Sequence, residues 1–351
     1  MVNSRQFLTG SEVFVRAAID SGAGFMFGYP ITPASEILSG WINSGKKYLQ
    51  TEDEIAAGFA LCGAVLGGEK AFTATSGPGN ILMQDGLSMA EGMRLPFVMV
   101  AAQRGGPSSG TVIYSQQEVI LSCFGGNGEG MRFVYSPSNL SELYKFTRKA
   151  FNDAWHYRFP AIILTDGYLL KTKGVIDFAK IGEIKNISPR ALVPKDSVVH
   201  WPNIYTFEEE LYQEIKLAKD DFEKVAEDIA DCESYQTDKA DILLVAHGIV
   251  GAAAKEAVDE LRKKGINAGL FRPITLRPLA RKKLDKIAGQ ESVKKIVVVE
   301  SSLGQLARII RDQIAPEICA EFAYMQYPGL GIETEAIVDF VAGLRVVSGE
   351  I

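Results

Sequence analysis

Short, unbroken apolar runs alternate with longer segments of helical spacing along the first half of the chain. The runs that predict buried strands cover 25–29, 71–75, 96–101, 133–135 and 161–165, and a shorter one surrounds Tyr48. The segments between them predict helices over 9–21, 33–44, 54–66, 80–91 and 138–156. Strands that lack a polar face and alternate with helices are typical of a parallel sheet covered on both faces. The pattern therefore predicts an α/β fold.

The regularity is lost between about 171 and 239. A strongly charged stretch, 207–231, predicts an exposed helix. A solvated connecting helix is the favoured interpretation, and a docking surface is the alternative. A second strand–helix series then follows, with strands over 242–246, 268–271 and 296–299 and helices over 250–264 and 303–314. We expect three parts: an α/β domain over 1–185, a linker with a charged helix over 186–238, and a second, smaller α/β domain over 239–351.

The composition and charge of the chain argue against two classes of protein, nucleic-acid binders and membrane-spanning proteins. The chain has 351 residues, of which 47% are hydrophobic and 23% charged, enough for two cores. A net charge of -6 argues against a nucleic-acid binder, which would carry a basic face. No apolar run approaches the roughly 20 residues that span a membrane, and the N-terminus lacks the pattern of a signal peptide. We expect a cytoplasmic protein.

Cysteine and histidine spacing does not predict a metal site. The four cysteines lie far apart and none has C-x-x-C spacing, so no iron–sulfur or zinc motif is visible. The three histidines lack metal-ligand spacing. The glycine-rich loop over 125–130 follows a helix rather than a strand, so the context of a dinucleotide-binding fingerprint is missing.

The first candidate site joins the GYPITP segment at 28–33 to Glu54. Pro30 and Pro33 stiffen the turn after a predicted strand and hold Thr32 at its carboxyl end, where open α/β sheets place their ligands. Pro33 also suits the first turn of the next helix. Glu54 begins a helix, where the helix dipole favours an acid. Taken alone it is a helix-start acid; its pairing with Thr32 favours a functional role.

Two further segments follow predicted strands. Arg104 comes after the apolar run 97–101, and its planar guanidinium suits a carboxylate. An ion pair with a nearby acid is an equal alternative. The segment Ser76-Gly77-Pro78-Gly79 joins a strand to a helix and could offer N–H groups to an anion. A close turn required by the fold is the favoured interpretation there.

The motifs GYPITPASEI, TEDEIAAGFALCGA, TATSGPGN and AAQRGGPSSG resemble, in order and spacing, the α subunit of 2-oxoacid:ferredoxin oxidoreductases. The resemblance covers nearly the whole chain and is strongest over 28–110 and 248–305. It implies a parallel-sheet domain that binds the pyrimidine of thiamine diphosphate. A smaller α/β domain like the C-terminal domain of transketolase would follow.

The resemblance also implies roles for single residues. Glu54 matches the glutamate that bonds to N1′ of the aminopyrimidine and favours its imino tautomer, with Glu52 as the alternative acid. Thr32 and Arg104 match residues that contact the substrate carboxylate. The positions implied to contact the cofactor are Tyr29, Pro30, Ile31, Glu54, Ser76 and Gly77.

The chain carries no G-D-G motif followed by an Asn-bearing segment, and Asp166-Gly167 is too slight a fragment of one. The resemblance therefore implies a β subunit that holds the diphosphate, Mg²⁺ and an iron–sulfur cluster, and in many members a γ subunit. The implied reaction is the coenzyme A-dependent oxidative decarboxylation of a 2-oxo acid to an acyl-CoA, with electrons passed to ferredoxin. 2-Oxoglutarate is the favoured acid; pyruvate and branched-chain acids remain open.

Two other functions remain open. The first is one half of a non-oxidative thiamine enzyme, such as a decarboxylase or transketolase. The second is a nucleotide-binding scaffold subunit without catalysis. Iron–sulfur ligands in the partner would argue against the first, and loss of turnover on replacing Glu54 would argue against the second.

Overall fold

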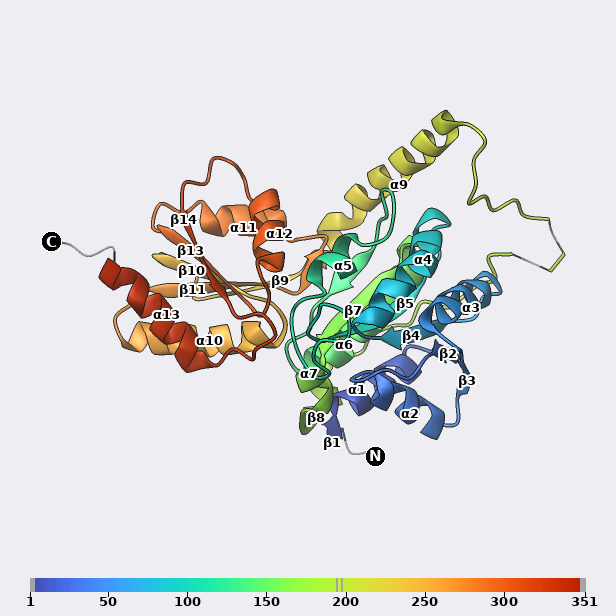
Figure 1. The fold of residues 1–351 in the computed structure, drawn as a ribbon, viewed down its shortest axis with the longest axis horizontal. Helices are drawn as coiled ribbons and strands as arrows, with labels where there is room; N and C mark the ends of the chain where they lie inside the picture. Colours follow the sequence, from blue (N-terminus) through green and yellow to red (C-terminus); the bar gives the residue numbers. More distant parts are fainter. Residues whose placement is uncertain (1–3, 194, 197, 348–351) are drawn as a thin grey trace.

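The computed structural model describes residues 4–193, 195–196 and 198–347, which form two α/β units lying side by side (Figure 1). The first unit contains a seven-stranded sheet in the order β12-β6-β7-β5-β4-β2-β3. Its strands are β2 (Phe25–Gly28), β3 (Lys47–Gln50), β4 (Ala71–Thr75), β5 (Val98–Gln103), β6 (Phe133–Tyr135), β7 (Ala161–Asp166) and β12 (Thr275–Arg277). Neighbours pair in parallel except β12, which is antiparallel to β6. The predicted α/β class is confirmed.

Helices cover both faces of this sheet. Met99 and Ala101 of β5 pack on the side of α3 (Glu54–Leu66), α4 (Pro78–Gly92) and α5 (Val119–Phe124). Val98 and Val100 of the same strand pack on the opposite side, against α1 (Gly10–Asp20), α2 (Ser35–Asn43) and α6 (Leu140–Tyr157). Because both faces are buried, the strand reads as an unbroken apolar run in the sequence.

The second unit contains a five-stranded sheet in the order β14-β13-β10-β11-β9. Its strands are β9 (Cys232–Tyr235), β10 (Ile242–Val245), β11 (Ala268–Pro273), β13 (Lys295–Glu300) and β14 (Glu321–Gln326). Only the edge strand β9 is antiparallel. The helices of this unit are α10 (Gly248–Lys263), α11 (Arg281–Ala288), α12 (Gln305–Gln313) and α13 (Thr334–Val347).

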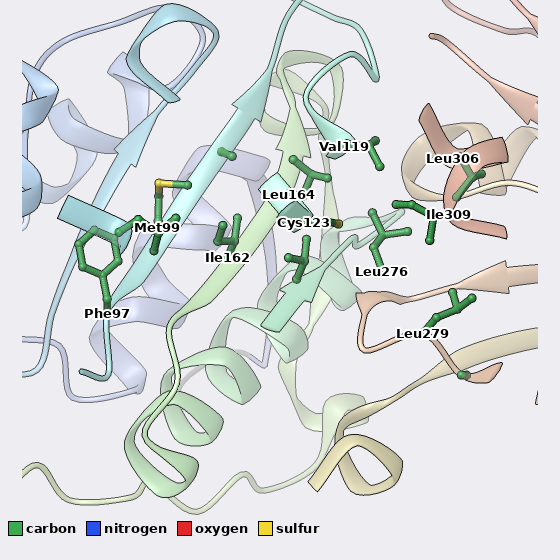
Figure 2. Close-up of a cluster of buried hydrophobic side chains, with 14 of the residues drawn as sticks. Phe97, Met99, Val119, Cys123, Ile162, Leu164, Leu276, Leu279, Leu306 and Ile309 are labelled. Carbon is green, nitrogen blue, oxygen red and sulfur yellow. The ribbon is translucent and has the colours of Figure 1, made fainter. Parts of the chain in front are cut away.

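One apolar cluster continues from the first unit into the second. Figure 2 shows Cys123 of α5 near Leu276 of β12, with Ile309 of α12 beside them. Met99 and Ile162, from the middle of the first sheet, belong to the same cluster. The two units therefore share a core rather than meeting through polar surfaces alone.

Smaller elements complete the chain. A two-stranded antiparallel sheet joins β1 (Arg5–Thr9) to β8 (Lys173–Asp177), and the short helices α7 (Gly167–Lys171) and α8 (Phe178–Ile181) flank β8. The long helix α9 (Glu208–Ile229) extends away from the body in Figure 1. Of its residues only Phe222 and Ile229 are buried, which agrees with a solvated connecting helix.

Several elements differ from the sequence prediction. Pro33 lies before helix α2, which begins at Ser35 with Ala34 as its N-cap. The strands β1, β8, β9, β12 and β14 and the helices α7, α8, α11 and α13 are not among the predicted elements. Strands β1, β8 and β14 are partly exposed edge strands without a long apolar run. β12 is a strand only because residues of the second unit reach back to β6.

The predicted boundaries between the parts stay a prediction. β9 falls within the expected linker, yet it pairs with β11 of the second sheet. β12 falls within the expected second domain, yet it belongs to the first sheet. Among the described residues, no helix combines the length and the apolar character needed to cross a membrane.

Candidate active site

Glu54 is the first residue of α3, and its carboxyl group is enclosed. Asp53 caps the helix by accepting a hydrogen bond from the Ala56 N–H at 2.8 Å. The Glu54 residue is only 4% exposed, and the Thr75 hydroxyl, at the end of β4, donates to its Oε1 over 3.4 Å. Glu52, the alternative acid, is exposed. The structure therefore favours Glu54 over Glu52 as the acid of an enclosed site.

Gly79, in the first turn of α4, makes room for this carboxyl group. A Cβ atom at position 79 would lie 2.1 Å from Oε1 of Glu54 and 2.2 Å from Oγ1 of Thr75. These distances are far shorter than a van der Waals contact, so a side chain at position 79 would displace the Glu54 carboxyl or the Thr75 hydroxyl. The strand β4 and the helices α3 and α4 thus meet at the acid.

Burial raises the pKa of the Glu54 carboxyl above its ordinary value, while its own backbone N–H and the Thr75 hydroxyl act in the opposite direction. An enclosed carboxyl of this kind keeps its proton to a higher pH than an exposed glutamate. It can therefore share a proton with a basic nitrogen brought against it.

Arg104 comes directly after β5, and its side chain is hydrogen-bonded to the proline-rich loop at 28–33. Its Nη1 donates to the backbone carbonyl of Thr32 at 2.8 Å. The side chain also lies against the turn after β4, because a Cβ atom at Gly77 would be 2.8 Å from Arg104 Nε. Arg104 is only 7% exposed, and its Nε has no hydrogen-bond partner in the described part of the chain. The expected alternative, an ion pair with an acid, is not formed among the described residues.

The remaining predicted positions lie on the same two loops. Tyr29 and Pro30 are exposed and Ile31 is half-buried, on the loop whose Thr32 carbonyl is held by Arg104. Ser76 is buried, and its hydroxyl has no hydrogen-bond partner among the described residues. Gly77 has a φ of 52°, a backbone conformation that favours glycine. The contacts of Arg104 thus join the two loops that the sequence singled out.

Glu118 is a polar residue of this corner that sequence reasoning missed. Its Oε1 accepts the backbone N–H groups of Gly77 and Arg104, both at 2.9 Å. Its Oε2 accepts the side-chain amide of Asn80 at 2.8 Å. The only sequence signal is an acid in front of the apolar segment VILSCF, the same pattern that marks Glu54 in front of IAAGFA.

The residues present fit a planar heterocycle with a basic nitrogen. They offer one enclosed carboxyl, together with the Ser76 hydroxyl and the Arg104 Nε, neither of which has a partner within the described ranges. Among the described residues, no group of three histidine, cysteine, aspartate or glutamate side chains is placed to hold a metal ion.

His247 is buried at the start of α10, where its Nδ1 lies 2.8 Å from the Ser136 hydroxyl.

Comparison with known families covers most of the chain. Residues 16–238 match the thiamine diphosphate-binding domain of pyruvate flavodoxin/ferredoxin oxidoreductases. Residues 240–330 match core domain II of pyruvate:ferredoxin oxidoreductase.

Curated relatives share about a third of their residues with the chain. The ketoisovalerate oxidoreductase subunit VorB of Methanothermobacter thermautotrophicus is 32% identical, over 87% of this chain and 89% of the relative. The 2-oxoglutarate synthase subunit KorA of Methanocaldococcus jannaschii is 33% identical, over 86% and 89%.

Two solved structures resemble the fold. The 2-oxoglutarate:ferredoxin oxidoreductase of Magnetococcus marinus matches with a TM-score of 0.83 and 26% identity, over 97% of this chain and 65% of that chain. This chain therefore spans about two thirds of the length of that one. A split-gene transketolase matches with a TM-score of 0.60 at 14% identity, over 96% of this chain and 98% of that one, and shares the fold alone. The chain belongs to the 2-oxoacid:ferredoxin oxidoreductase family and carries its thiamine diphosphate-binding domain, followed by core domain II.

Proposed function

We propose that this chain is the α subunit of a 2-oxoacid:ferredoxin oxidoreductase and that Glu54 activates its thiamine diphosphate. The observation that carries the proposal is the enclosed Glu54 carboxyl, held between Thr75 and Gly79 at the carboxyl end of β4. When bound, the cofactor would supply a thiazolium carbon that becomes nucleophilic on losing its proton, and a ring that would serve as electron sink for the loss of CO₂. Glu54 holds the proton at the ring nitrogen of the aminopyrimidine.

In this proposal Arg104 and Thr32 bind the carboxylate of the substrate. The Nε of Arg104 is a buried donor that has no hydrogen-bond partner among the described residues, and leaving such a donor unsatisfied costs free energy until an acceptor binds it. A 2-oxo acid brings that acceptor. The Arg104 side chain contacts two loops, one containing Thr32 and the other containing Gly77. The residues of these loops that are proposed to contact the cofactor are Tyr29, Pro30, Ile31, Ser76 and Gly77.

The other half of the site is proposed to come from a β subunit, which holds the diphosphate, Mg²⁺ and an iron–sulfur cluster. Large apolar side chains are exposed on the neighbouring helices α3 and α4 near the site, namely Ile55, Phe59, Ile81 and Leu82. Exposed apolar side chains gathered on two adjacent helices support a protein interface there. Coenzyme A, ferredoxin and a possible γ subunit complete the proposed complex. The four cysteines are free thiols, which suits the cytoplasm.

The substrate remains open between 2-oxo acids. 2-Oxoglutarate stays the first choice because the GYPITPASEI and QRGGPSSG segments look closest to that branch, and the Magnetococcus structure agrees with it. The ketoisovalerate relative, however, is 32% identical, against 33% for the 2-oxoglutarate relative, so overall identity does not separate the two acids. A branched-chain acid is therefore the second candidate.

The test is turnover of the complex formed with the co-expressed partner subunit. 2-Oxoglutarate, 2-oxoisovalerate and pyruvate are assayed with coenzyme A and an artificial electron acceptor. We expect Glu54→Gln to lower turnover by about 10²-fold or more, because the acid–base group is lost. The exposed Glu52→Gln is the matched control and should keep wild-type turnover. Equal turnover of wild type and Glu54→Gln would refute the role of Glu54, and no turnover of any 2-oxo acid by the wild-type complex would refute the function.

A further inference from the structure

Arg104 begins an irregular loop that runs from the end of β5 to the start of α5. Three contacts within the loop close it: the Gly105 N–H donates to Thr111 Oγ1, the Thr111 N–H donates to the Gly105 carbonyl, and the Gly106 N–H donates to Gln117 Oε1, all at 2.9 Å. None of these contacts fixes the loop to the turn after β4, against which the Arg104 side chain lies. Glu118, at the far end of the loop, makes that connection.

We propose that Glu118 is a positioning residue of this site: its carboxylate ties the Gly77 turn to the Arg104 backbone and so sets where the guanidinium meets the substrate. One oxygen accepts both backbone N–H groups at 2.9 Å, and the other accepts the Asn80 amide of α4 at 2.8 Å. The inference rests on the proposed role of Arg104 as the group that binds the substrate carboxylate.

Burial of Glu118 raises the free-energy cost of ionising its carboxyl group. The residue is 5% exposed, and burial raises the pKa of its carboxyl, while the Asn80 amide and the two backbone N–H groups act to lower it. Hydrogen bonds to an ionised group are shorter and stronger than those between neutral groups. All three donors converge on one side chain, so its removal leaves Gly77 and Arg104 without their shared acceptor.

The second unit holds Glu118 in place. Gln116 exchanges hydrogen bonds with the Ser301 backbone at 3.0 and 3.1 Å, and its side-chain amide donates to the His247 carbonyl at 3.0 Å. Gln305 of α12 donates to the Gln117 carbonyl at 2.7 Å and accepts the Ile120 N–H at 3.0 Å. The residues on both sides of Glu118 are therefore fixed to another part of the molecule, which gives its carboxylate a rigid base.

A double-mutant cycle in the assembled complex tests the inference. We expect Glu118→Ala to raise the KM for the 2-oxo acid by about tenfold, with a smaller change in kcat. In an Arg104→Met background the same substitution should change KM by less than about twofold, because the group it positions is already absent. The control is Ser122→Ala, which removes only a 3.3 Å contact with the same Asn80 amide and should leave KM unchanged.

A second readout does not depend on activity. Hydrogen–deuterium exchange of peptides covering 74–80 and 101–106 should accelerate in Glu118→Ala, because the Gly77 and Arg104 amides lose their acceptor. Glu118→Gln keeps an amide oxygen for both N–H groups but loses the acceptor for the Asn80 amide. It should therefore restore the protection of the two amides and reverse part of the increase in KM. If Glu118→Ala does not assemble, Glu118→Asp, which withdraws the carboxylate by one methylene, is expected to show both changes in reduced form.

Two results would overturn the inference: an unchanged KM in Glu118→Ala, or a KM increase of equal size in the wild-type and Arg104→Met backgrounds. The second result would mean that Glu118 supports the fold without acting through Arg104. Either can occur in a complex whose wild type turns over a 2-oxo acid, so failure of this inference is distinguishable from failure of the proposed function.

Discussion

Residue-scale packing around Glu54 depends on the absence of a side chain at position 79. The Glu54 carboxyl occupies the space that a Cβ atom of residue 79 would fill. The acid, the Thr75 hydroxyl and the first turn of α4 are consequently in close contact, and water is largely kept from the carboxyl. The raised pKa of Glu54 and its proposed role follow from the same enclosure.

We predict that Gly79→Ala lowers turnover of the complex by about 10²-fold, because the added methyl group must displace the carboxyl, and misplacement by about 1 Å has effects of this size. The control is Gly63→Ala in α3, where an added Cβ meets no atom within 4 Å. That variant should keep activity and gain slightly in stability, since alanine favours a helix over glycine. Full activity of Gly79→Ala would contradict the enclosed placement of Glu54.

At the scale of elements, the short helix α5 connects the site to the second unit. Glu118 precedes its first residue, Cys123 enters the shared apolar core, and Gln305 of α12 bonds to the segment on both sides. An irregular loop that carries substrate-binding residues needs such support, because its own backbone bonds are few. The position of α12 therefore contributes to the order of the Arg104 loop.

Gln305→Ala is expected to destabilise this connection by about 1–2 kcal/mol, because two hydrogen bonds to the backbone are lost. The measurements are the free energy of unfolding and the hydrogen exchange of peptides covering 113–124, which should exchange faster. Arg308→Ala, on the exposed side of the same helix, is the control and should change neither. Unaltered exchange in Gln305→Ala would show that α5 is held by its apolar contacts alone.

At the scale of the whole molecule, polar contacts as well as the shared core join the two units. Arg272 of β11 donates to both carboxyl oxygens of Glu142 in α6, at 2.6 and 3.0 Å, and also pairs with Glu233. His247, fully buried, meets Ser136 across the same boundary. Burial, together with the nearby positive charge of Arg272, lowers the pKa of His247 to about 3.

The stability of the protein should therefore fall as the pH decreases. The unfolded chain takes up a proton on His247 near pH 6.5, whereas the folded protein keeps the ring neutral down to about pH 3. The contribution is complete above about pH 6.5 and is lost as the pH falls toward about 3. Thermal unfolding at pH 7 and pH 5 should show a smaller loss of Tm for His247→Asn than for wild type. Parallel losses in the two proteins would exclude His247 as the titrating group.

Local signals in the sequence predicted much of the fold. Thr9 and Glu12 form a capping box at the start of α1, within the predicted helix 9–21, and α3 covers the predicted 54–66. β4 and β6 also match their predicted ranges, because fully buried strands read as apolar runs. The strand β12 was missed because it is a strand only through pairing with the distant β6, which no local pattern specifies, and β14 was missed because it is a partly exposed edge strand without a long apolar run.

By itself the sequence determined the local elements, the helix-start position of Glu54 and the placement of Thr32 and Arg104 after strands. Only the tertiary structure decided that Arg104 bonds to a carbonyl 72 positions away, that Gly79 makes room for Glu54, and that Glu118 joins the Gly77 and Arg104 segments. The physical reason is the range of each interaction. Caps and periodic burial act between neighbours in the chain and leave a pattern in it. A carboxylate that accepts N–H groups from two separate loops is defined only when the sheet brings those loops together.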